Sequence, residues 1–122
     1  MPNTDPKAFL ILIVEDQALV RVCICEQLED AGFGVIEAAD AEEALISFET
    51  HAGVTTLFTD INMPGALDGV ALAHKIFSLR PEVQLILTSG RAQPAAHTLP
   101  PGARFLAKPY HCKGLTDLIK AA

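Results

Sequence analysis

Several short runs of this chain are apolar or β-branched at nearly every position, and this pattern limits the possible folds more than any other feature. A strand on a half-solvated sheet alternates apolar and polar residues, whereas a strand buried on both faces is apolar throughout. The clearest run, residues 8–14, reads AFLILIV and ends at two acids. Similar runs cover residues 54–58, 83–87 and 105–107, with a short strand predicted at 33–37. The pattern predicts a central sheet that is covered on both faces.

The stretches between these strands carry helical patterns. Apolar side chains recur at helical spacing in residues 17–31, 41–50, 70–79 and 113–120. Asp40 is a suitable N-cap for the second of these helices, and Glu43 completes a capping-box pattern. Strands that alternate with helices are typical of a parallel α/β sheet. We expect one domain over residues 8–122, preceded by a flexible lead-in over residues 1–7.

The first predicted helix has a wide apolar sector. The residues predicted to face the sheet are Val20, Ile24, Leu28 and Ala31. The apolar residues that lie around from that face are Leu19, Val22 and Cys23. This second group could be a half-covered flank of the core, or it could contact a partner protein.

The segment between the fourth and fifth strands is irregular. It reads GRAQPAAHTLPPGARF from Gly90 to Phe105 and contains three prolines. Proline lacks the backbone N–H that a helix interior needs, so one or two helical turns starting near Pro94 are the most that fits. We predict a short or distorted fourth helix.

Polar side chains follow four of the predicted strands at the point where each strand ends. They are Glu15, Asp16, Asp60, Thr88 and Lys108. The carboxyl ends of parallel strands meet at one edge of a sheet, and ligands bind there in folds of this class. We therefore expect the three acids and the lysine to converge on one small site. Each residue alone also has a structural explanation; Asp16, for example, could cap the first helix.

Composition argues against several classes of protein. The formal net charge is −6, whereas a nucleic-acid-binding domain needs a basic face. Cys23, Cys25 and Cys112 have no C-x-x-C spacing, which predicts free thiols in a reducing compartment, and the four histidines show no metal-binding spacing. Residues 1–7 do not form a secretory signal, and no apolar run reaches the length that spans a membrane. We expect a cytoplasmic protein that contacts neither nucleic acid nor membrane.

Taken together, these residues resemble the receiver domains of bacterial two-component response regulators. The resemblance rests on the acidic pair Glu15-Asp16, the sequence DINMPGALDG from Asp60 to Gly69, Thr88, and the dipeptide Lys108-Pro109. It covers essentially the whole chain in the expected order. It implies a flavodoxin-like (βα)5 fold, doubly wound around a parallel five-stranded sheet with strand order 2-1-3-4-5.

The resemblance also implies roles for the acids. Asp60 would accept a phosphoryl group from a histidine kinase or a histidine phosphotransfer protein. Mg²⁺ would be held by Glu15, Asp16 and Asp60 together with the backbone carbonyl of Asn62. A divalent cation suits such a cluster, because the carboxylates otherwise repel one another and the incoming phosphoryl group.

Further implied roles concern the switch between two states. Thr88 and Lys108 would contact the phosphoryl group, and Phe105 stands where the family has its switch aromatic. Thr88 would move toward modified Asp60, and Phe105 could fill the cavity behind it, which changes the surface offered to a downstream effector or a homodimer. The family also implies a cis peptide before Pro109. Such a domain is a signalling module that takes part in its own phosphorylation, and not an enzyme.

Two other classes of protein use similar residues. A haloacid dehalogenase-like aspartyl-phosphate hydrolase also uses Mg²⁺, aspartate and lysine. It needs D-x-D-x-[TV] after its first strand, where this chain reads Glu15-Asp16-Gln17. A flavin-binding electron carrier would need hydroxyls and backbone donors for its phosphate in the same loop, which is acidic in this chain.

The chain also departs from the common receiver pattern. Glu15 replaces the more usual aspartate, the loop at residues 64–69 is one residue longer, and the fourth helix is short. Gly90, two residues past Thr88, places no side chain over the phosphoryl group. We therefore expect water to enter easily, an effect that Asn62, two residues past Asp60, would temper.

Overall fold

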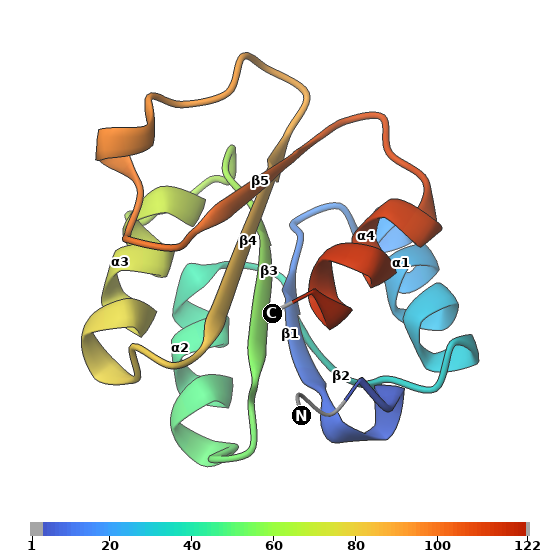
Figure 1. Ribbon diagram of the computed structural model, residues 1–122. Helices are drawn as coiled ribbons and strands as arrows, with labels where there is room; N and C mark the ends of the chain where they lie inside the picture. The colour runs from blue at the N-terminus through green and yellow to red at the C-terminus, as the bar shows by residue number, and fades with distance from the viewer. Residues whose placement is uncertain (1–3, 122) are drawn as a thin grey trace.

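The sheet has five parallel strands in the order β2-β1-β3-β4-β5, which confirms the order that the resemblance implied (Figure 1). The computed structural model describes residues 4–121; residues 1–3 of the expected lead-in and residue 122 lie outside the described residues. The strands are β1 (Leu10–Val14), β2 (Gly34–Ala38), β3 (Thr56–Asp60), β4 (Gln84–Ser89) and β5 (Arg104–Ala107). The strand order reverses between β1 and β3, and ligands bind at such a reversal in doubly wound folds.

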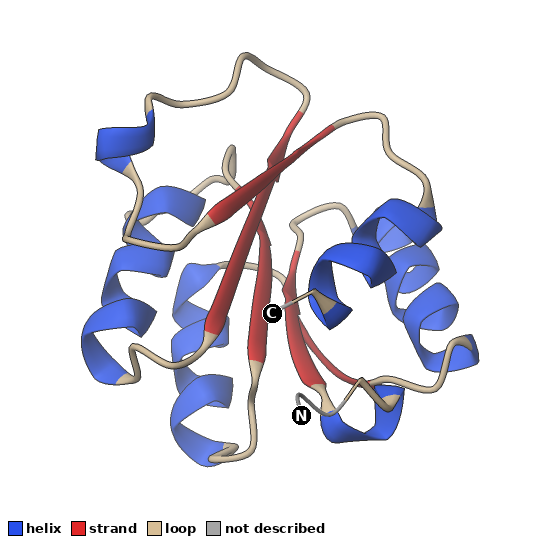
Figure 2. Cartoon of the chain, viewed as in Figure 1, coloured by secondary structure: helices blue, strands red, loops and turns tan. Residues whose placement is uncertain are grey.

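Helices cover both faces of this sheet (Figures 1 and 2). Over residues 4–121 the α-helices are α1 (Ala18–Asp30), α2 (Ala41–Thr50), α3 (Gly69–Leu79) and α4 (Cys112–Lys120). α1 and α4 pack on one face, and α2 and α3 pack on the other. Two 3-10 turns, η1 (Pro6–Ala8) and η2 (Ala96–Thr98), are also present, so the lead-in holds one turn of helix. No helix of the described residues combines the length and apolar character that crossing a membrane requires.

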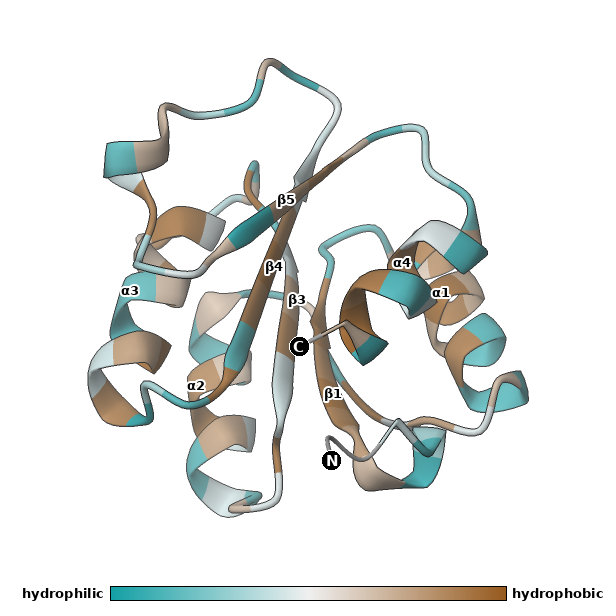
Figure 3. Ribbon diagram, in the orientation of Figure 1, coloured by the Kyte–Doolittle hydropathy of each residue, from teal (hydrophilic) through white to brown (hydrophobic). Residues whose placement is uncertain are grey.

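The sheet divides the interior into two cores. Leu12 and Val14 of β1 face the core under α2 and α3, whereas Ile11 and Ile13 face the core under α1 and α4. Successive residues of a strand point to opposite faces, so a strand between two cores must be apolar at each position. Figure 3 shows the strands as predominantly hydrophobic ribbons. Each fully buried aliphatic side chain contributes about 1.5–3 kcal/mol to folding.

The inward face of α1 differs from the prediction. Ile24, Cys25 and Leu28 are the buried residues of this helix. Val20 is 36% exposed, and Ala31 is an exposed residue just past the last turn, so both were wrongly assigned to the sheet-facing side. The contact face is therefore a tight group one turn long, since α1 meets the sheet mainly through its second half.

The outer part of α1 carries apolar side chains into solvent. Leu19 is 83% exposed and Val22 is 42% exposed, and Cys23 is exposed as well. The core does not cover this flank. Of the two alternatives given above, contact with a partner protein therefore stays a prediction.

The predicted short or distorted fourth helix is reduced to the single 3-10 turn η2. The turn is closed by a hydrogen bond from the hydroxyl of Thr98 to the carbonyl of Ala95 at 2.7 Å. His74 of α3 lies 2.7 Å from the carbonyl of Thr98 through its Nε2 atom, which ties the segment to the α3 side of the sheet. The prolines on both sides of η2 prevent its extension into an α-helix.

Local signals were most accurate at α2. The side chain of Asp40 accepts a hydrogen bond from the N–H of Glu43 at 2.8 Å, as an N-cap should. Glu43 in turn accepts a bond from the N–H of Ala39 at 3.3 Å, one residue before the position that the capping box uses. Caps of this kind contribute about 1 kcal/mol to stability.

Gly69 gives a test of how closely α3 approaches the site strand. A Cβ atom on this residue would lie against the carbonyl of Asp60 and 2.8 Å from the Cα atom of Ile61, so backbone would have to move. We expect Gly69→Ala to lower the free energy of unfolding by about 1–3 kcal/mol or more, the range of overpacked cores. Denaturation in urea measures this value.

Gly114 provides the matched control, because it is also helical but a Cβ atom there meets nothing within 4 Å. Gly114→Ala should raise the free energy of unfolding by about 0.5–1 kcal/mol, the difference in helix propensity. Equal effects of the two substitutions would show that the close approach at Gly69 has no energetic weight.

Candidate functional site

Parallel pairing brings the predicted site residues to one edge of the sheet. Val14 of β1 pairs with Thr59 of β3. Glu15 and Asp60 are the next residues along these two neighbouring strands, so they lie side by side. Asp60 pairs in turn with Thr88 at the end of β4. The strand register therefore places acids and hydroxyl side by side, as the sequence predicted.

The three acids form one cluster. Glu15, Asp16 and Asp60 each offer a carboxylate oxygen, and these oxygens all lie within 4.8 Å of one another. Glu15 and Asp60 are buried, whereas Asp16 is exposed. The N-cap of α1 is Gln17, which makes no side-chain capping bond, so Asp16 is not the helix cap of the alternative explanation. An acid that caps nothing and faces two others is available for a cation.

Burial has a clear effect on Glu15. Burial raises the pKa of its carboxyl above the ordinary value, and the side chain of Asp16 and the negative charge of Asp60 add to the rise. The N–H of Gln17 donates a hydrogen bond to Glu15 at 3.2 Å and, with the charge of Lys108, opposes the rise only in part. The folded protein therefore holds the charged form of Glu15 at a cost.

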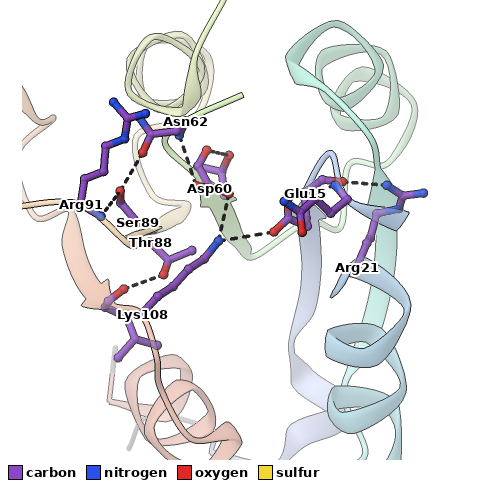
Figure 4. Close-up of polar contacts among 11 residues, drawn as sticks. Glu15, Arg21, Asp60, Asn62, Thr88, Ser89, Arg91 and Lys108 are labelled. Atoms are coloured by element: carbon purple, nitrogen blue, oxygen red, sulfur yellow. Dashed lines mark hydrogen bonds and ion pairs between the residues drawn. The ribbon is translucent and has the colours of Figure 1, made fainter. Parts of the chain in front are cut away.

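Lys108 is the cation of the cluster (Figure 4). Its Nζ atom lies 3.0 Å from Oδ2 of Asp60 and 3.5 Å from Oε1 of Glu15. Burial by itself lowers the pKa of Lys108, but the hydrogen bond and the charge of Asp60, helped by Glu15, outweigh burial and raise it. The peptide bond between Lys108 and Pro109 is cis, as the family resemblance implied.

The structure separates Thr88 from Phe105. The hydroxyl of Thr88 donates a hydrogen bond to the carbonyl of Leu106 at 2.6 Å, across the β4–β5 pair. Phe105 packs into the core under α2 and α3, whereas Leu106 belongs to the opposite core. The two predicted switch residues are therefore brought to neighbouring strands but not to one cavity.

A small cavity beside Thr88 is bounded by a residue that the sequence analysis did not single out. The cavity has a volume of about 10 Å³, roughly the space for one water molecule. Its lining includes Asp60, Phe58 and Tyr110 along with Thr88. Two features of the sequence could have pointed to Tyr110: it follows Lys108 by two residues, and it is the one tyrosine of the chain.

Two further residues, Arg21 and Ser89, support the site, and the sequence assigned a role to neither. Arg21 donates a hydrogen bond to the backbone carbonyl of Glu15 at 2.7 Å and pairs with Glu37 of β2 at 3.2 Å. Ser89 donates to the side-chain oxygen of Asn62 at 2.7 Å and accepts the N–H of Arg91 at 3.0 Å (Figure 4). Sequence spacing gives no signal for either contact, because the partners come from different strands and loops.

Comparison with known proteins agrees with this geometry. The family model described as "Response regulator receiver domain" matches residues 11–120. The chain belongs to this family. It is thus a receiver domain of two-component systems, and nothing in the comparisons supports the haloacid dehalogenase alternative.

Similar proteins include both a kinase and a small regulator. The sensor kinase CckA of Brucella abortus is 36% identical to this receiver domain over 114 residues, 90% of this chain and 12% of the kinase. The response regulator receiver protein CpdR of the same bacterium is 29% identical over 90% of this chain and 92% of its own length. A crystal structure of the receiver domain from the hybrid histidine kinase CckA has a TM-score of 0.78 and 34% identity, and covers 92% of this chain and 96% of that one.

The most similar curated relatives are mostly longer than this receiver domain. The chain spans 12% of CckA and 26% of the C4-dicarboxylate transport regulator DctD of Rhizobium meliloti, to which it is 36% identical over 98% of its own residues. The same fold unit therefore occurs in proteins of different overall architecture.

The cost of burying Glu15 leads to a test. Glu15→Gln removes a charge that the fold disfavours, so in Mg²⁺-free buffer at neutral pH it should raise the free energy of unfolding. Because the pKa of Glu15 is raised in the folded protein, this gain in stability should shrink as the pH falls through that pKa. It should vanish below about the ordinary value of 4.5, where Glu15 is neutral in the folded and in the unfolded protein. Denaturation in urea across this pH range measures it.

Exposed Glu26 on α1 provides the control, and Glu26→Gln should change stability by less than about 0.5 kcal/mol. A loss of stability in Glu15→Gln at neutral pH would mean that the pairing with Lys108 outweighs the cost of burial.

Proposed function

We propose that this receiver domain accepts a phosphoryl group on Asp60 from a histidine kinase or a histidine phosphotransfer protein. The observation that carries the proposal is the ammonium of Lys108, held 3.0 Å from the carboxylate of Asp60 and 3.5 Å from that of Glu15. A phosphoryl group brings negative oxygens toward the carboxylate, so a fixed cation lowers the energy of the approach. The similarity to a sensor kinase, CckA, supports a histidine kinase as partner.

The proposed transfer exchanges one bond for another at phosphorus. An oxygen of Asp60 forms a bond to phosphorus while the bond from phosphorus to the donor nitrogen breaks, and the leaving imidazole keeps the electron pair. The N–H of Asn62 donates to Oδ1 of Asp60 at 3.2 Å, and Lys108 donates to Oδ2 at 3.0 Å. These two donors orient the carboxylate for attack. Thr88 adds a third donor to the product once its hydroxyl leaves the carbonyl of Leu106.

The acid cluster also suits Mg²⁺. Three carboxylates and one ammonium leave a net charge of −2, and hard oxygen ligands are those that Mg²⁺ prefers. We propose Glu15, Asp16, Asp60 and the backbone carbonyl of Asn62 as the ligands. When bound, the ion neutralises charge that the phosphoryl oxygens bring. The crystal structure of a CheX-CheY-BeF3-Mg²⁺ complex from Borrelia burgdorferi supports this; it is 27% identical to this chain with a TM-score of 0.81.

We propose that the phosphodonor docks on the apolar part of α1. An open groove of about 760 Å³ extends from Lys108 and Gly90 to Leu19 and Val20. A donor histidine must come within bonding distance of Asp60, so the protein that carries it must contact the surface beside Lys108. Exposed apolar side chains at this place supply contact area for such a partner.

We further propose that residues 8–122 form the receiver unit, which the family match over residues 11–120 supports. Its role would be that of a cytoplasmic signalling module and not of an enzyme. One relative, a methylesterase/glutaminase of Anaeromyxobacter dehalogenans, is 32% identical over 31% of its length, so receivers do occur in longer enzymes. The output partner, an effector or a second copy, would use the surface altered by the reduced fourth helix.

The site of modification can be tested with acetyl phosphate and Mg²⁺. The wild-type chain should gain one phosphoryl group by intact mass, and Asp60→Asn should gain none. Asp68→Asn is the matched control: Asp68 caps α3 through a bond from Ala71 at 2.9 Å, a function that asparagine retains. Asp68→Asn should therefore be labelled like the wild type. Labelling of Asp60→Asn, or turnover of unrelated phosphate esters, would contradict the proposal.

The lifetime of phospho-Asp60 should depend on Gly90. A Cβ atom on this residue meets nothing within 4 Å, so Gly90→Arg can fold and place a guanidinium over the site. If the guanidinium excludes water or hydrogen-bonds the phosphoryl group, and this raises the activation free energy of hydrolysis by about 1 kcal/mol, the lifetime should rise about fivefold. Gly114→Arg on α4, equally open, is the control. Decay of the labelled mass measures both, and identical lifetimes would show that Gly90 does not admit the water.

A further inference from the structure

We infer that Tyr110, and not Phe105, is the aromatic side chain that moves when Asp60 is occupied, and that Thr88 transmits the change to it. The inference rests on the proposed function and adds to it the residue that responds. Its basis is the cavity that Thr88 and Tyr110 share beside Asp60. Phe105 does not line that cavity; it lines a separate groove with His74 and Leu99 on the other side of the sheet.

The volume of the cavity limits what Thr88 can do. At about 10 Å³ the cavity has no room for a displaced side chain. If Thr88 leaves the carbonyl of Leu106 to reach a group on Asp60, a neighbouring side chain must adjust to the new shape. Close-packed interiors transmit such displacements instead of absorbing them.

Among the described residues that line the cavity, two side chains are only half-buried. The apolar residues Ile13, Ile24 and Phe58 are buried in the core, with at most 8% of each exposed. Lys108 and Tyr110 are the half-buried members of the wall. Lys108 is tied to Asp60 by an ion pair of 3.0 Å, which leaves the ring of Tyr110.

The ring of Tyr110 also has somewhere to go. Its inner edge meets Phe58 in a T-shaped contact, with ring centroids 5.8 Å apart and planes at 85°. Its other side lines the open groove of about 760 Å³ that includes Leu19 and Val20 of α1. An outward shift of the ring would therefore change the wall of this groove. Occupation of Asp60 and the shape of the surface at α1 are coupled through one side chain.

The composition of the chain makes the inference directly measurable. Tyr110 is the one tyrosine, and the chain has no tryptophan, so tyrosine emission reports this ring alone. Burial, with the charges of Glu15 and Asp60, raises the pKa of Tyr110 to about 12, so the phenol stays neutral at physiological pH and its emission is not complicated by ionisation.

The experiment titrates beryllofluoride with Mg²⁺ into the full chain. Fluorine NMR measures binding of the fluoride complex, and acrylamide quenching of tyrosine emission measures exposure of the ring. We expect increased quenching on binding in the wild type and in Phe105→Leu. We expect no such increase in Thr88→Val, which keeps the volume of the side chain but lacks the hydroxyl; Thr88→Ala serves as a second variant if Thr88→Val does not fold.

The outcomes are distinct. If the wild type binds beryllofluoride but the acrylamide quenching of its tyrosine emission does not change, the inference is overturned and the proposed function stays intact. Loss of the response in Phe105→Leu, with the response kept in folded Thr88→Val or Thr88→Ala, overturns it in favour of Phe105. Absence of bound fluoride in the wild type contradicts the proposed function itself, and the inference falls with it.

Discussion

Charge balance among three carboxylates is the constraint on which this structure depends. Two unit charges of the same sign about 4 Å apart repel by about 4 kcal/mol at an effective dielectric constant of 20. The fold nevertheless holds Glu15, Asp16 and Asp60 within 4.8 Å, and it buries two of them. Lys108 offsets part of the repulsion and leaves a surplus of two negative charges. Folding energy from the two cores maintains this arrangement, and the proposed Mg²⁺ would balance the surplus charge.

The acids and the hydroxyls of the site are held by different contacts, although Glu15, Asp60, Thr88 and Ser89 are all buried. The strands that deliver the acids lie between two cores, and Arg21 fixes the backbone after β1 by a bond to the carbonyl of Glu15. By contrast, the hydroxyls at the end of β4 each donate one hydrogen bond, from Thr88 to the carbonyl of Leu106 and from Ser89 to the side chain of Asn62. A phosphoryl group would compete for the first of these bonds. Because Ser89 follows Thr88 directly, movement of one residue would reach the loop that carries Asn62.

The reduced fourth helix lies on the crossover between β4 and β5, away from the strand ends that carry the site. The crossover from β4 to β5 needs only to return the chain to the start of β5, and the 3-10 turn η2 is enough for that. An open groove of about 600 Å³ lies between this segment and α3, with Phe105 in its wall. The residues proposed to react lie at the strand ends, whereas the surface proposed for output lies at the crossover, so the two occupy separate parts of the fold.

Local sequence determined the elements and the chemistry of this protein. Apolar runs specified strands between two cores, the cap at Asp40 specified the start of α2, and acids placed at strand ends predicted the cluster around Asp60. These features depend on neighbours within a few residues, so they can be read without coordinates.

Tertiary structure alone decided which side chains share a cavity. The β4–β5 register pairs Leu87 with Phe105 and Thr88 with Leu106, and a strand sends successive residues to opposite faces. Thr88 and Phe105 are thereby separated, and Tyr110 comes to Thr88 from beyond the end of β5. Likewise, Val20 faces solvent because the second half of α1 meets the sheet. Register and packing angle depend on contacts distant in the chain, and residue spacing does not encode them.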